Sequence, residues 1–269
     1  MKSGATVPVF RVLATRAVLV SVLVSLAVST ARAQWSSAPV LRPEILAEIP
    51  HDTGAFTQGL VWLNGDLYES TGLYGESTLR RVNPRTGAVM RLQKLPAATF
   101  AEGLAWFQGG LIQLTWQEGQ AFRYTLANWK KPASNFKYAG EGWGLTAIGS
   151  TLWMSNGSDT LYRRDAAFRV TGRAAVKRDG RPVPRLNELE AARGKVVANV
   201  WYSDSLFIID PANGRVLAVV DASGLTARSG RRSADEVLNG IAYDPSKKVF
   251  YLTGKKWPKM FKVRIPFNF

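Results

Sequence analysis

Five short segments, spread along the chain, combine aromatic, amide and carboxylate side chains in a pattern that could do chemistry. They are Phe56-Thr-Gln-Gly59, Phe100-Ala-Glu-Gly103, Gly140-Glu-Gly-Trp143, Leu186-Asn-Glu-Leu-Glu190 and Leu238-Asn-Gly240. Three of them carry carboxylates at points where a chain folding for packing alone would place apolar side chains. Trp116, Trp201, Lys255 and Trp257 follow these segments in the sequence. If the segments converge in space, they form an apolar, Trp-lined pocket with a few polar groups, which is the usual composition of a ligand site.

The residue types exclude several kinds of chemistry. His51 is the only histidine and there is no cysteine, so we expect no zinc site of the usual kind, and Ser-His-Asp catalysis is hard to build. No serine stands in a nucleophile elbow, and no phosphate-binding or dinucleotide-binding glycine motif follows a strand. What remains is proton transfer by a carboxylate, without a metal or any other cofactor.

The residues alone leave blander interpretations open. Each Trp could be a packing residue, since aromatic side chains dominate protein cores. A buried glutamate could simply accept hydrogen bonds from loop amides. Lys255 and Lys256 could be no more than a solvated pair.

After about residue 55 the chain reads as short strands, each a run of β-branched, aromatic or alternating residues bounded by turn signals. Asn64-Gly65, Arg85-Thr-Gly87, Asn156-Gly157 and Asn213-Gly214 supply residues that tolerate the positive φ of tight hairpins. No convincing amphipathic helix follows residue 33. The sequence therefore predicts an all-β protein.

The strand pattern also repeats. Gly59-Leu60, Gly103-Leu104, Gly144-Leu145 and Gly240-Ile241 each begin an apolar strand, and Leu189-Glu190 takes that place in the fourth copy, so the spacings are 44, 41, 45 and 51 residues. Such periods, built from four antiparallel strands, are typical of β-propeller blades, whose inner strands converge on a central channel. We therefore predict a five-bladed β-propeller. Its fifth blade is one strand short, and the N-terminal segment Val40–Ile49 is expected to complete it and close the ring. A pair of β-sandwich domains is the alternative, but it gives no reason for the near-constant period.

The first 33 residues have the pattern of an export signal. Lys2, Arg11 and Arg16 precede the apolar run Ala17–Val28, and Ala31-Arg32-Ala33 supplies a small-x-small cleavage site. The apolar run is shorter than the ~20 residues that a membrane-spanning helix needs. We therefore expect a signal peptide over residues 1–33, a single propeller domain over residues 34–269, no stable membrane insertion, and a secreted or periplasmic location.

The chain is strongly basic, with a formal net charge of +15. Four basic residues and no acidic ones lie in the leader, which leaves +11 for the rest. The basic residues are scattered, and their tight clusters fall in the loop-like stretches Lys177–Arg185 and Arg228–Arg232. We therefore expect a solvated basic surface and a monomer that does not bind nucleic acid.

A series of motifs in order resembles the glutaminyl cyclases of plants and bacteria. The series comprises Pro50-His-Asp52 with Phe56-Thr-Gln-Gly-Leu60, Glu69-Ser-Thr-Gly-Leu-Tyr-Gly75, Glu102-Gly-Leu104, Gln113-Leu-Thr-Trp116 with Glu118-Gly119, Gly140-Glu-Gly-Trp-Gly-Leu145, Leu186-Asn-Glu-Leu-Glu190, Ala198-Asn-Val-Trp201, Leu238-Asn-Gly-Ile-Ala-Tyr-Asp244 and Thr253-Gly-Lys255 with Trp257-Pro258. It runs from about residue 50 to residue 263. The family fold is a five-bladed propeller, which agrees with the repeat count.

The resemblance implies an enzyme that converts the N-terminal Gln of peptides and proteins to pyroglutamate and releases ammonia, without a metal. It implies that Glu102 is the proton shuttle, with Asn187 and Lys255 completing the polar set of the site. The substrate-binding residues that it implies are Phe56, Gln58, Phe100, Trp116, Trp143 and Trp201.

Two questions stay open at this stage. A non-catalytic propeller that binds a peptide or a glycan in the same pocket is the alternative function. The loops Thr171–Arg185 and Thr226–Glu236 depart most from the family pattern, so the preference for substrate residues beyond the Gln is not predicted.

Overall fold

The structure is a computed structural model that describes residues 1, 4 and 37–268. The chain divides into two units, Met1–Trp35 and Ser36–Phe269, and the fold described below belongs to the second. The predicted signal peptide over residues 1–33 lies outside the described residues, apart from Met1 and Gly4. Within the described part of the chain, no helix has the length and apolar character needed to cross a membrane.

The strands form five sheets, and four of these have four strands each. The first is β3 (Thr57–Leu63), β4 (Asp66–Thr71), β5 (Thr78–Val82) and β6 (Val89–Lys94). The second is β7 (Ala101–Phe107), β8 (Gly110–Thr115), β9 (Gln120–Tyr124) and β10 (Ser134–Lys137). The third is β11 (Leu145–Ile148), β12 (Thr151–Met154), β13 (Thr160–Arg164) and β14 (Val170–Ala175). The last of the four is β21 (Leu238–Asp244), β22 (Val249–Gly254), β23 (Lys259–Arg264) and β2 (Glu44–Pro50).

The remaining sheet has seven strands. Its four successive antiparallel strands are β17 (Leu186–Ala192), β18 (Lys195–Val200), β19 (Ser205–Asp210) and β20 (Arg215–Asp221). Three short strands extend it beyond β20, namely β1 (Val40–Leu41), β15 (Lys177–Arg178) and β16 (Arg181–Pro182). Both β1 and β15 pair with β20 in the parallel direction.

The prediction of a five-bladed propeller closed by the N-terminal segment Val40–Ile49 is therefore wrong. There are four regular four-stranded blades, and the other sheet has seven strands. The N-terminal segment does not act as one strand either, because β1 pairs with β20 while β2 pairs with β23. Arg42 and Pro43 separate the two strands. Proline has no backbone N–H and restricts the residue before it, so a continuous ladder is not maintained there.

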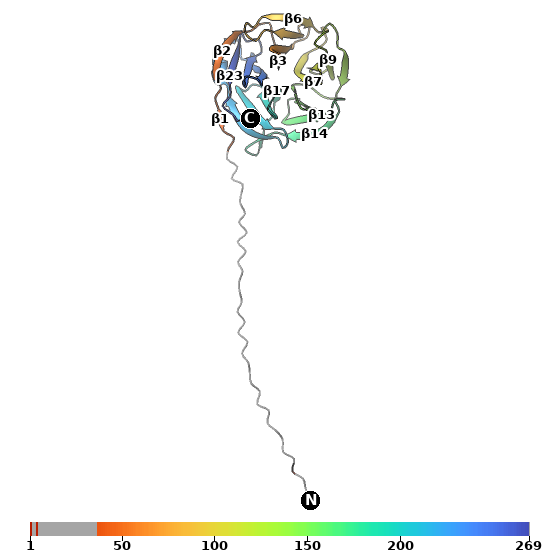
Figure 1. The fold of residues 1–269 in the computed structure, drawn as a ribbon, viewed down its shortest axis with the longest axis vertical. Coiled ribbons are helices and arrows are strands. Elements are labelled where there is room, and N and C mark those ends of the chain that lie inside the picture. The colour runs from red at the N-terminus through yellow and green to blue at the C-terminus, as the bar shows by residue number, and fades with distance from the viewer. Residues whose placement is uncertain (2–3, 5–36, 269) are drawn as a thin grey trace. The chain divides into compact units, whose positions relative to one another are not determined.

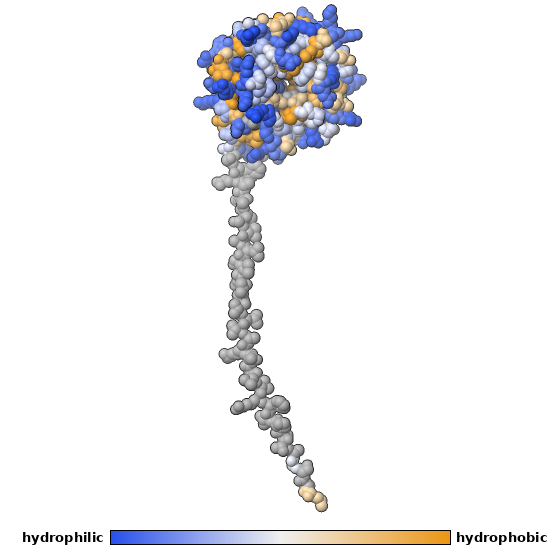
Figure 2. Space-filling view, viewed as in Figure 1, coloured by the Kyte–Doolittle hydropathy of each residue, from blue (hydrophilic) through white to orange (hydrophobic). Residues whose placement is uncertain are grey.

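Apolar side chains hold neighbouring sheets together. One buried cluster joins Leu206 and Ile208 on β19 to Leu252 on β22. Another joins Leu60 on β3 to Tyr251 on β22, which connects the first and last sheets in the sequence. In Figure 1, β3, β7 and β17 lie towards the middle of this unit, and β2, β6 and β14 lie at its edge. Figure 2 shows hydrophilic side chains interspersed with apolar ones over the visible face of the same unit.

Glycine permits the inner strands to approach each other closely. A Cβ atom on Gly59 would lie 2.4 Å from the backbone nitrogen of Leu104, and one on Gly103 would lie 2.5 Å from that of Leu145. These distances are too short for any side chain, so glycine is required where adjacent inner strands meet. The repeat of Gly followed by an apolar residue in the sequence is the result of this contact.

The local predictions hold for turns better than for short elements. Asn64 and Gly65 both have positive φ, 51° and 90°, as a tight hairpin between β3 and β4 requires. The helix α1 (Ser223–Arg228) was not predicted, because its six residues are too few to show a helical period.

Candidate functional site

Four polar residues of the candidate site share one position in the repeat. On β3, β7, β17 and β21, the pairing register shifts just where Gln58, Glu102, Asn187 and Asn239 occur. A β-bulge inserts an extra residue and turns its side chain away from the ladder, which is why bulges are common beside active sites. Four inner strands therefore use the same irregularity to present a polar side chain.

This register corrects the sequence alignment of the fourth copy. Because Leu186 and Leu189 flank the shift on β17 as Leu238 and Ile241 do on β21, Glu188 and not Leu189 is equivalent to Gly240. Glu188 is 1% exposed, and its carboxylate accepts a hydrogen bond from the backbone N–H of Leu60 at 3.3 Å. Burial, and then the nearby Glu190, raise the pKa of Glu188 well above 4.5.

Glu102 lies at the end of a chain of hydrogen bonds between side chains. Gln58 Nε2 donates to Glu102 Oε1 at 2.8 Å, and Asn239 Nδ2 donates to Gln58 Oε1 at 3.1 Å. Asn239 Nδ2 also donates to the Thr57 carbonyl at 2.8 Å. Since the Gln58 oxygen already accepts from Asn239, its amide nitrogen must face Glu102. Asn239 thus orients Gln58, and Gln58 orients the carboxylate.

Burial moves Glu102 and Lys255 toward their neutral forms. Glu102 is 5% exposed, and burial is the main cause that raises the pKa of its carboxyl well above 4.5. The charge of Lys255 opposes this shift, whereas Glu141 and Glu118 add to it. Burial also lowers the pKa of Lys255 below 10.5. A carboxyl with a raised pKa can both take up and give back a proton near neutral pH.

The turn after β22 presents Lys255. A Cβ atom on Gly254 would lie 2.2 Å from the Trp257 ring, so the ring packs directly on this glycine. Trp257 is fully buried and its Nε1 donates to the Glu236 carbonyl at 2.7 Å. Lys255 Nζ lies 4.7 Å from the centre of the Phe56 ring, which favours its charged form through a cation–π contact. Trp257, which the sequence grouped with the pocket residues, is instead an anchor in the core.

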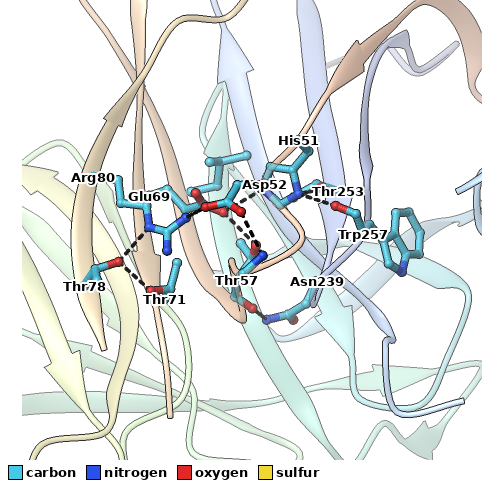
Figure 3. Close-up of polar contacts among 12 residues, drawn as sticks. His51, Asp52, Thr57, Glu69, Thr71, Thr78, Arg80, Asn239, Thr253 and Trp257 are labelled. Carbon is cyan, nitrogen blue, oxygen red and sulfur yellow. Dashed lines mark hydrogen bonds and ion pairs between the residues drawn. The ribbon is translucent and has the colours of Figure 1, made fainter. Parts of the chain in front are cut away.

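A buried polar network contacts this turn at Trp257 (Figure 3). His51 Nδ1 lies 2.7 Å from the Trp257 carbonyl, and its Nε2 lies 2.9 Å from Glu69 Oε1. Both acceptors need a proton from the ring, and the charge of Glu69 raises the pKa of His51 above 6.5 against the effect of burial, so we expect His51 to be a cation paired with the Glu69 carboxylate. Thr57 donates to the same carboxylate oxygen at 2.7 Å. The network therefore fixes Trp257, and with it the turn that carries Lys255.

Aromatic side chains form a half-buried series on the loops around Glu102. The ring centres of Phe56 and Phe100 are 6.2 Å apart, those of Phe100 and Trp116 are 5.5 Å apart, and those of Trp143 and Trp201 are 5.5 Å apart. Glu141 joins the two halves, because its Oε2 accepts from Trp116 Nε1 at 3.0 Å and from Trp143 Nε1 at 2.9 Å. We call Phe56, Phe100, Trp116, Trp143 and Trp201 the aromatic rim.

Eight of the nine predicted site residues take part in these contacts, in two groups. A hydrogen bond joins Gln58 to Glu102. Ring contacts and the bridging Glu141 join the other six, which are Lys255, Phe56, Phe100, Trp116, Trp143 and Trp201, and the charge of Lys255 acts on Glu102 across the two groups. Asn187 differs, because its backbone carbonyl accepts from Ser155 at 2.6 Å while its buried side-chain Oδ1 has no hydrogen-bond partner among the residues that the structure describes. A free, buried acceptor of this kind is suited to a substrate donor. The sequence prediction missed Asn239, Glu141 and the His51–Glu69 pair as supporting residues, although all four lie in the motifs quoted above. Paired amide and carboxylate residues in adjacent motifs were the available signal.

No group of three or more His, Cys, Asp or Glu side chains that could hold a metal ion is found among residues 37–268. What the site offers is a carboxyl with a raised pKa, a lysine and amide groups beneath aromatic side chains. This arrangement is suited to binding a small polar group and moving a proton.

Comparison with known proteins finds a close match over most of the chain. The family model described as glutamine cyclotransferase matches residues 17–265. A glutaminyl-peptide cyclotransferase of Arabidopsis thaliana is 43% identical over 227 residues, which are 82% of this chain and 71% of that protein. The crystal structure of a Myxococcus xanthus glutaminyl cyclase matches with a TM-score of 0.80 and 38% identity, covering 85% of this chain and 98% of that one.

Proposed function

The chain belongs to the glutamine cyclotransferase family, and from this premise we propose that it closes the N-terminal Gln of peptides and proteins to pyroglutamate, with Glu102 as the proton shuttle. The observation that carries the proposal is the buried Glu102 carboxyl, held by Gln58 and facing the charge of Lys255. A non-catalytic peptide-binding or glycan-binding propeller is not favoured, because such a protein has no need of a carboxyl with a raised pKa.

The reaction needs only one new bond. The α-amine nitrogen of the substrate attacks the carbon of its own γ-carboxamide, a five-membered ring closes, and the C–N bond to the amide nitrogen breaks. Because both groups belong to one residue, the nucleophile is already at a high effective concentration. Glu102 as carboxylate takes the proton from the attacking amine and, as acid, returns it to the departing nitrogen, which leaves as ammonia.

The remaining predicted residues have supporting roles in this proposal. Lys255 and the amide of Asn187 hydrogen-bond the carboxamide oxygen as it gains negative charge, a contribution often worth about 3–4 kcal/mol per donor. The aromatic rim binds the substrate in its folded conformer and excludes water. No step requires a metal ion. The protein acts after export, with the signal peptide removed behind Ala33.

Glu102→Gln is the variant that tests the shuttle. The neutral amide keeps the shape and the contact with Gln58 but cannot accept a proton, so ammonia release from a Gln-initiated peptide should fall at least about 10²-fold. Glu44→Gln is the matched control, since Glu44 is exposed on β2, pairs with Arg264 and, among the described residues, makes no contact with the site. A Glu102→Gln enzyme with near-normal turnover would place the chemistry on another carboxylate.

A further inference from the structure

We propose that a basic groove beside Trp201 binds the substrate residues that follow the N-terminal Gln and selects peptides with acidic side chains there. This inference rests on the proposed cyclase function and adds a substrate preference to it. The groove is lined by Arg178, Arg181 and Arg185 together with Trp201, Tyr202 and Phe207. It includes much of the loop over residues 171–185 for which the sequence predicted no role.

The groove begins at the aromatic rim. The backbone N–H of Trp201 donates to the Arg185 carbonyl at 2.9 Å, so these two residues lie side by side. Trp201 also contacts Trp143 of the aromatic rim, since the two rings stand edge-on with centres 5.5 Å apart. A peptide whose Gln is held beneath the rim can therefore continue along the groove without leaving the protein surface.

The groove is hollowed for structural reasons. The β15–β16 hairpin does not pack against β19 but joins the edge of the sheet at β20, where Lys177 pairs with Arg215. Residues 182–185, which include Pro182 and Pro184, then lead from the hairpin to β17. Prolines make this connection extended and leave fewer backbone donors to pair with other strands. The space between the connection and the Trp201–Tyr202 turn remains open.

The charge in the groove is unbalanced. Among its lining residues only Asp179 is acidic. This carboxylate is engaged twice, because Oδ1 accepts from the backbone N–H of Ala38 at 3.0 Å and Oδ2 lies 3.7 Å from Arg178 Nε. Arg181 and Arg185 are exposed, and neither has an ion pair within the part of the chain that the structure describes. Two uncommitted guanidinium groups beside half-buried aromatic rings suit a carboxylate-bearing peptide.

Tyr202 forms the wall between this groove and the second loop without a predicted role, Thr226–Glu236. Tyr202 is 52% exposed and has a positive φ of 60°, which a bulky residue rarely adopts. Its hydroxyl donates to Asp235 at 2.7 Å and its ring lies 4.6 Å from that of Trp201. A strained, exposed tyrosine that is fixed at both ends is consistent with a binding surface. Asp235 holds the hydroxyl and does not line the groove.

Three C-terminally amidated peptides test the preference, with Glu-Glu, Ser-Ser or Lys-Lys at the third and fourth positions of Gln-Ala-x-x-Ala. Measured as kcat/KM for ammonia release at low ionic strength, the Glu-Glu peptide should exceed the Lys-Lys peptide by roughly three- to tenfold, because exposed ion pairs are individually weak. The difference should shrink in about 1 M salt, where charges are screened over about 3 Å. The triple variant Arg178→Gln, Arg181→Gln, Arg185→Gln should lose the preference while turning over the Ser-Ser peptide nearly normally.

Arg85→Gln is the matched control, because Arg85 is exposed in the turn between β5 and β6 and does not line the groove. Equal kcat/KM values for the three peptides, or a preference that survives in the triple variant, would overturn the proposal. Binding of labelled peptides to Glu102→Gln, followed by fluorescence anisotropy, distinguishes failure of the cyclase function from failure of the groove proposal. If the wild type releases no ammonia while Glu102→Gln binds the peptides with charge selection, the cyclase function alone is rejected. Binding without charge selection rejects the groove.

Discussion

His51 should be a charged histidine in the folded protein at neutral pH, and replacing it should destabilise both the fold and the site. Its two ring nitrogens face the Trp257 carbonyl at 2.7 Å and the Glu69 carboxylate at 2.9 Å. The His51 and Glu69 side chains are each 1% exposed, so water cannot replace either contact. His51→Gln leaves the Glu69 carboxylate buried without its main cation, and Arg80 remains as a positive charge that acts on it.

The expected loss is large because the pair is buried. Removing one partner of a buried ion pair typically costs about 3–5 kcal/mol, since the other charge is left uncompensated. Glu69→Gln should cost less, because a neutral His51 can still donate to Trp257 while its other nitrogen accepts from the new amide. The double variant should show a coupling of at least about 1 kcal/mol in a thermodynamic cycle, since the two residues are in direct contact.

The pH dependence follows from the directions of the two shifts. Burial opposes the charge of His51, but Glu69 outweighs it and raises the pKa of His51 above 6.5. Burial likewise opposes the charge of Glu69, but His51, Arg80 and Thr57 lower its pKa below 4.5. The histidine's contribution is therefore complete below its unfolded pKa and is lost as the pH rises through the raised value. The glutamate's is complete above its unfolded pKa and is lost as the pH falls through the lowered value, so the pair contributes most between about pH 4.5 and 6.5.

The protonation state of His51 can be measured directly, because His51 is the only histidine in the chain. A nitrogen-15 NMR spectrum of the imidazole side chain should show two protonated nitrogens in the folded protein at pH 7. Urea denaturation of wild type, His51→Gln, Glu69→Gln and the double variant then gives the free energies of unfolding. A neutral tautomer at pH 7, or additive losses in the double variant, would refute the reasoning.

Three further outcomes are expected. Burial raises the pKa of Glu190 to about 8, so its contribution to stability falls as the pH rises from about 4.5 to 8; Glu190→Gln should lack this fall in urea denaturation at pH 5 and pH 9, and identical pH slopes would contradict it. Prolonged dialysis against a strong chelator should leave ammonia release intact, and activity restored only by zinc would reject the metal-independent mechanism. Removal of the signal peptide behind Ala33 would expose Gln34, which the enzyme should cyclise between molecules, so intact mass should fall by one ammonia faster in wild type than in Glu102→Gln; equal rates in both would mean that the closure is spontaneous.

The repeat and the strands could be predicted because they depend on local patterns. The apolar strand predicted at Gly59-Leu60 is part of β3 (Thr57–Leu63), which ends at the predicted Asn64-Gly65 turn, since apolar residues bounded by turn signals specify a strand directly. The seven-stranded sheet could not be predicted, because β15 and β16 have two residues each and show no period. Pairing between β1 and β20 joins residues about 180 positions apart, such as Val40 and Val219, and no local signal records such a contact.

Part of the candidate site could be predicted from the sequence for a different reason. A polar residue before the repeated glycine, such as Gln58 or Glu102, departs from the apolar pattern and so marks itself in the sequence. The supporting residues could not be predicted from a local pattern. His51 and Glu69 are 18 positions apart, and their role depends on which ring nitrogen faces which acceptor, which only the folded structure determines.

Glu188 shows how the site and the fold both depend on the β-bulge of the inner strands. On β3 and β7 the residues after the polar side chain of the bulge are Gly59 and Gly103, and a side chain at either would strike the neighbouring backbone. On β17 the equivalent residue is Glu188, whose carboxylate instead accepts the backbone N–H groups of Leu60 and Ile241. It thus links the inner strands β3 and β21 from the adjacent sheet. The same bulge presents Asn187 to the site, so Glu188 fixes the ring at the position where that residue leaves the ladder. Burying the Glu188 carboxyl costs free energy that a glycine there would not. A glycine, however, would leave the backbone N–H groups of Leu60 and Ile241 unpaired, so the glutamate supports the geometry of the site.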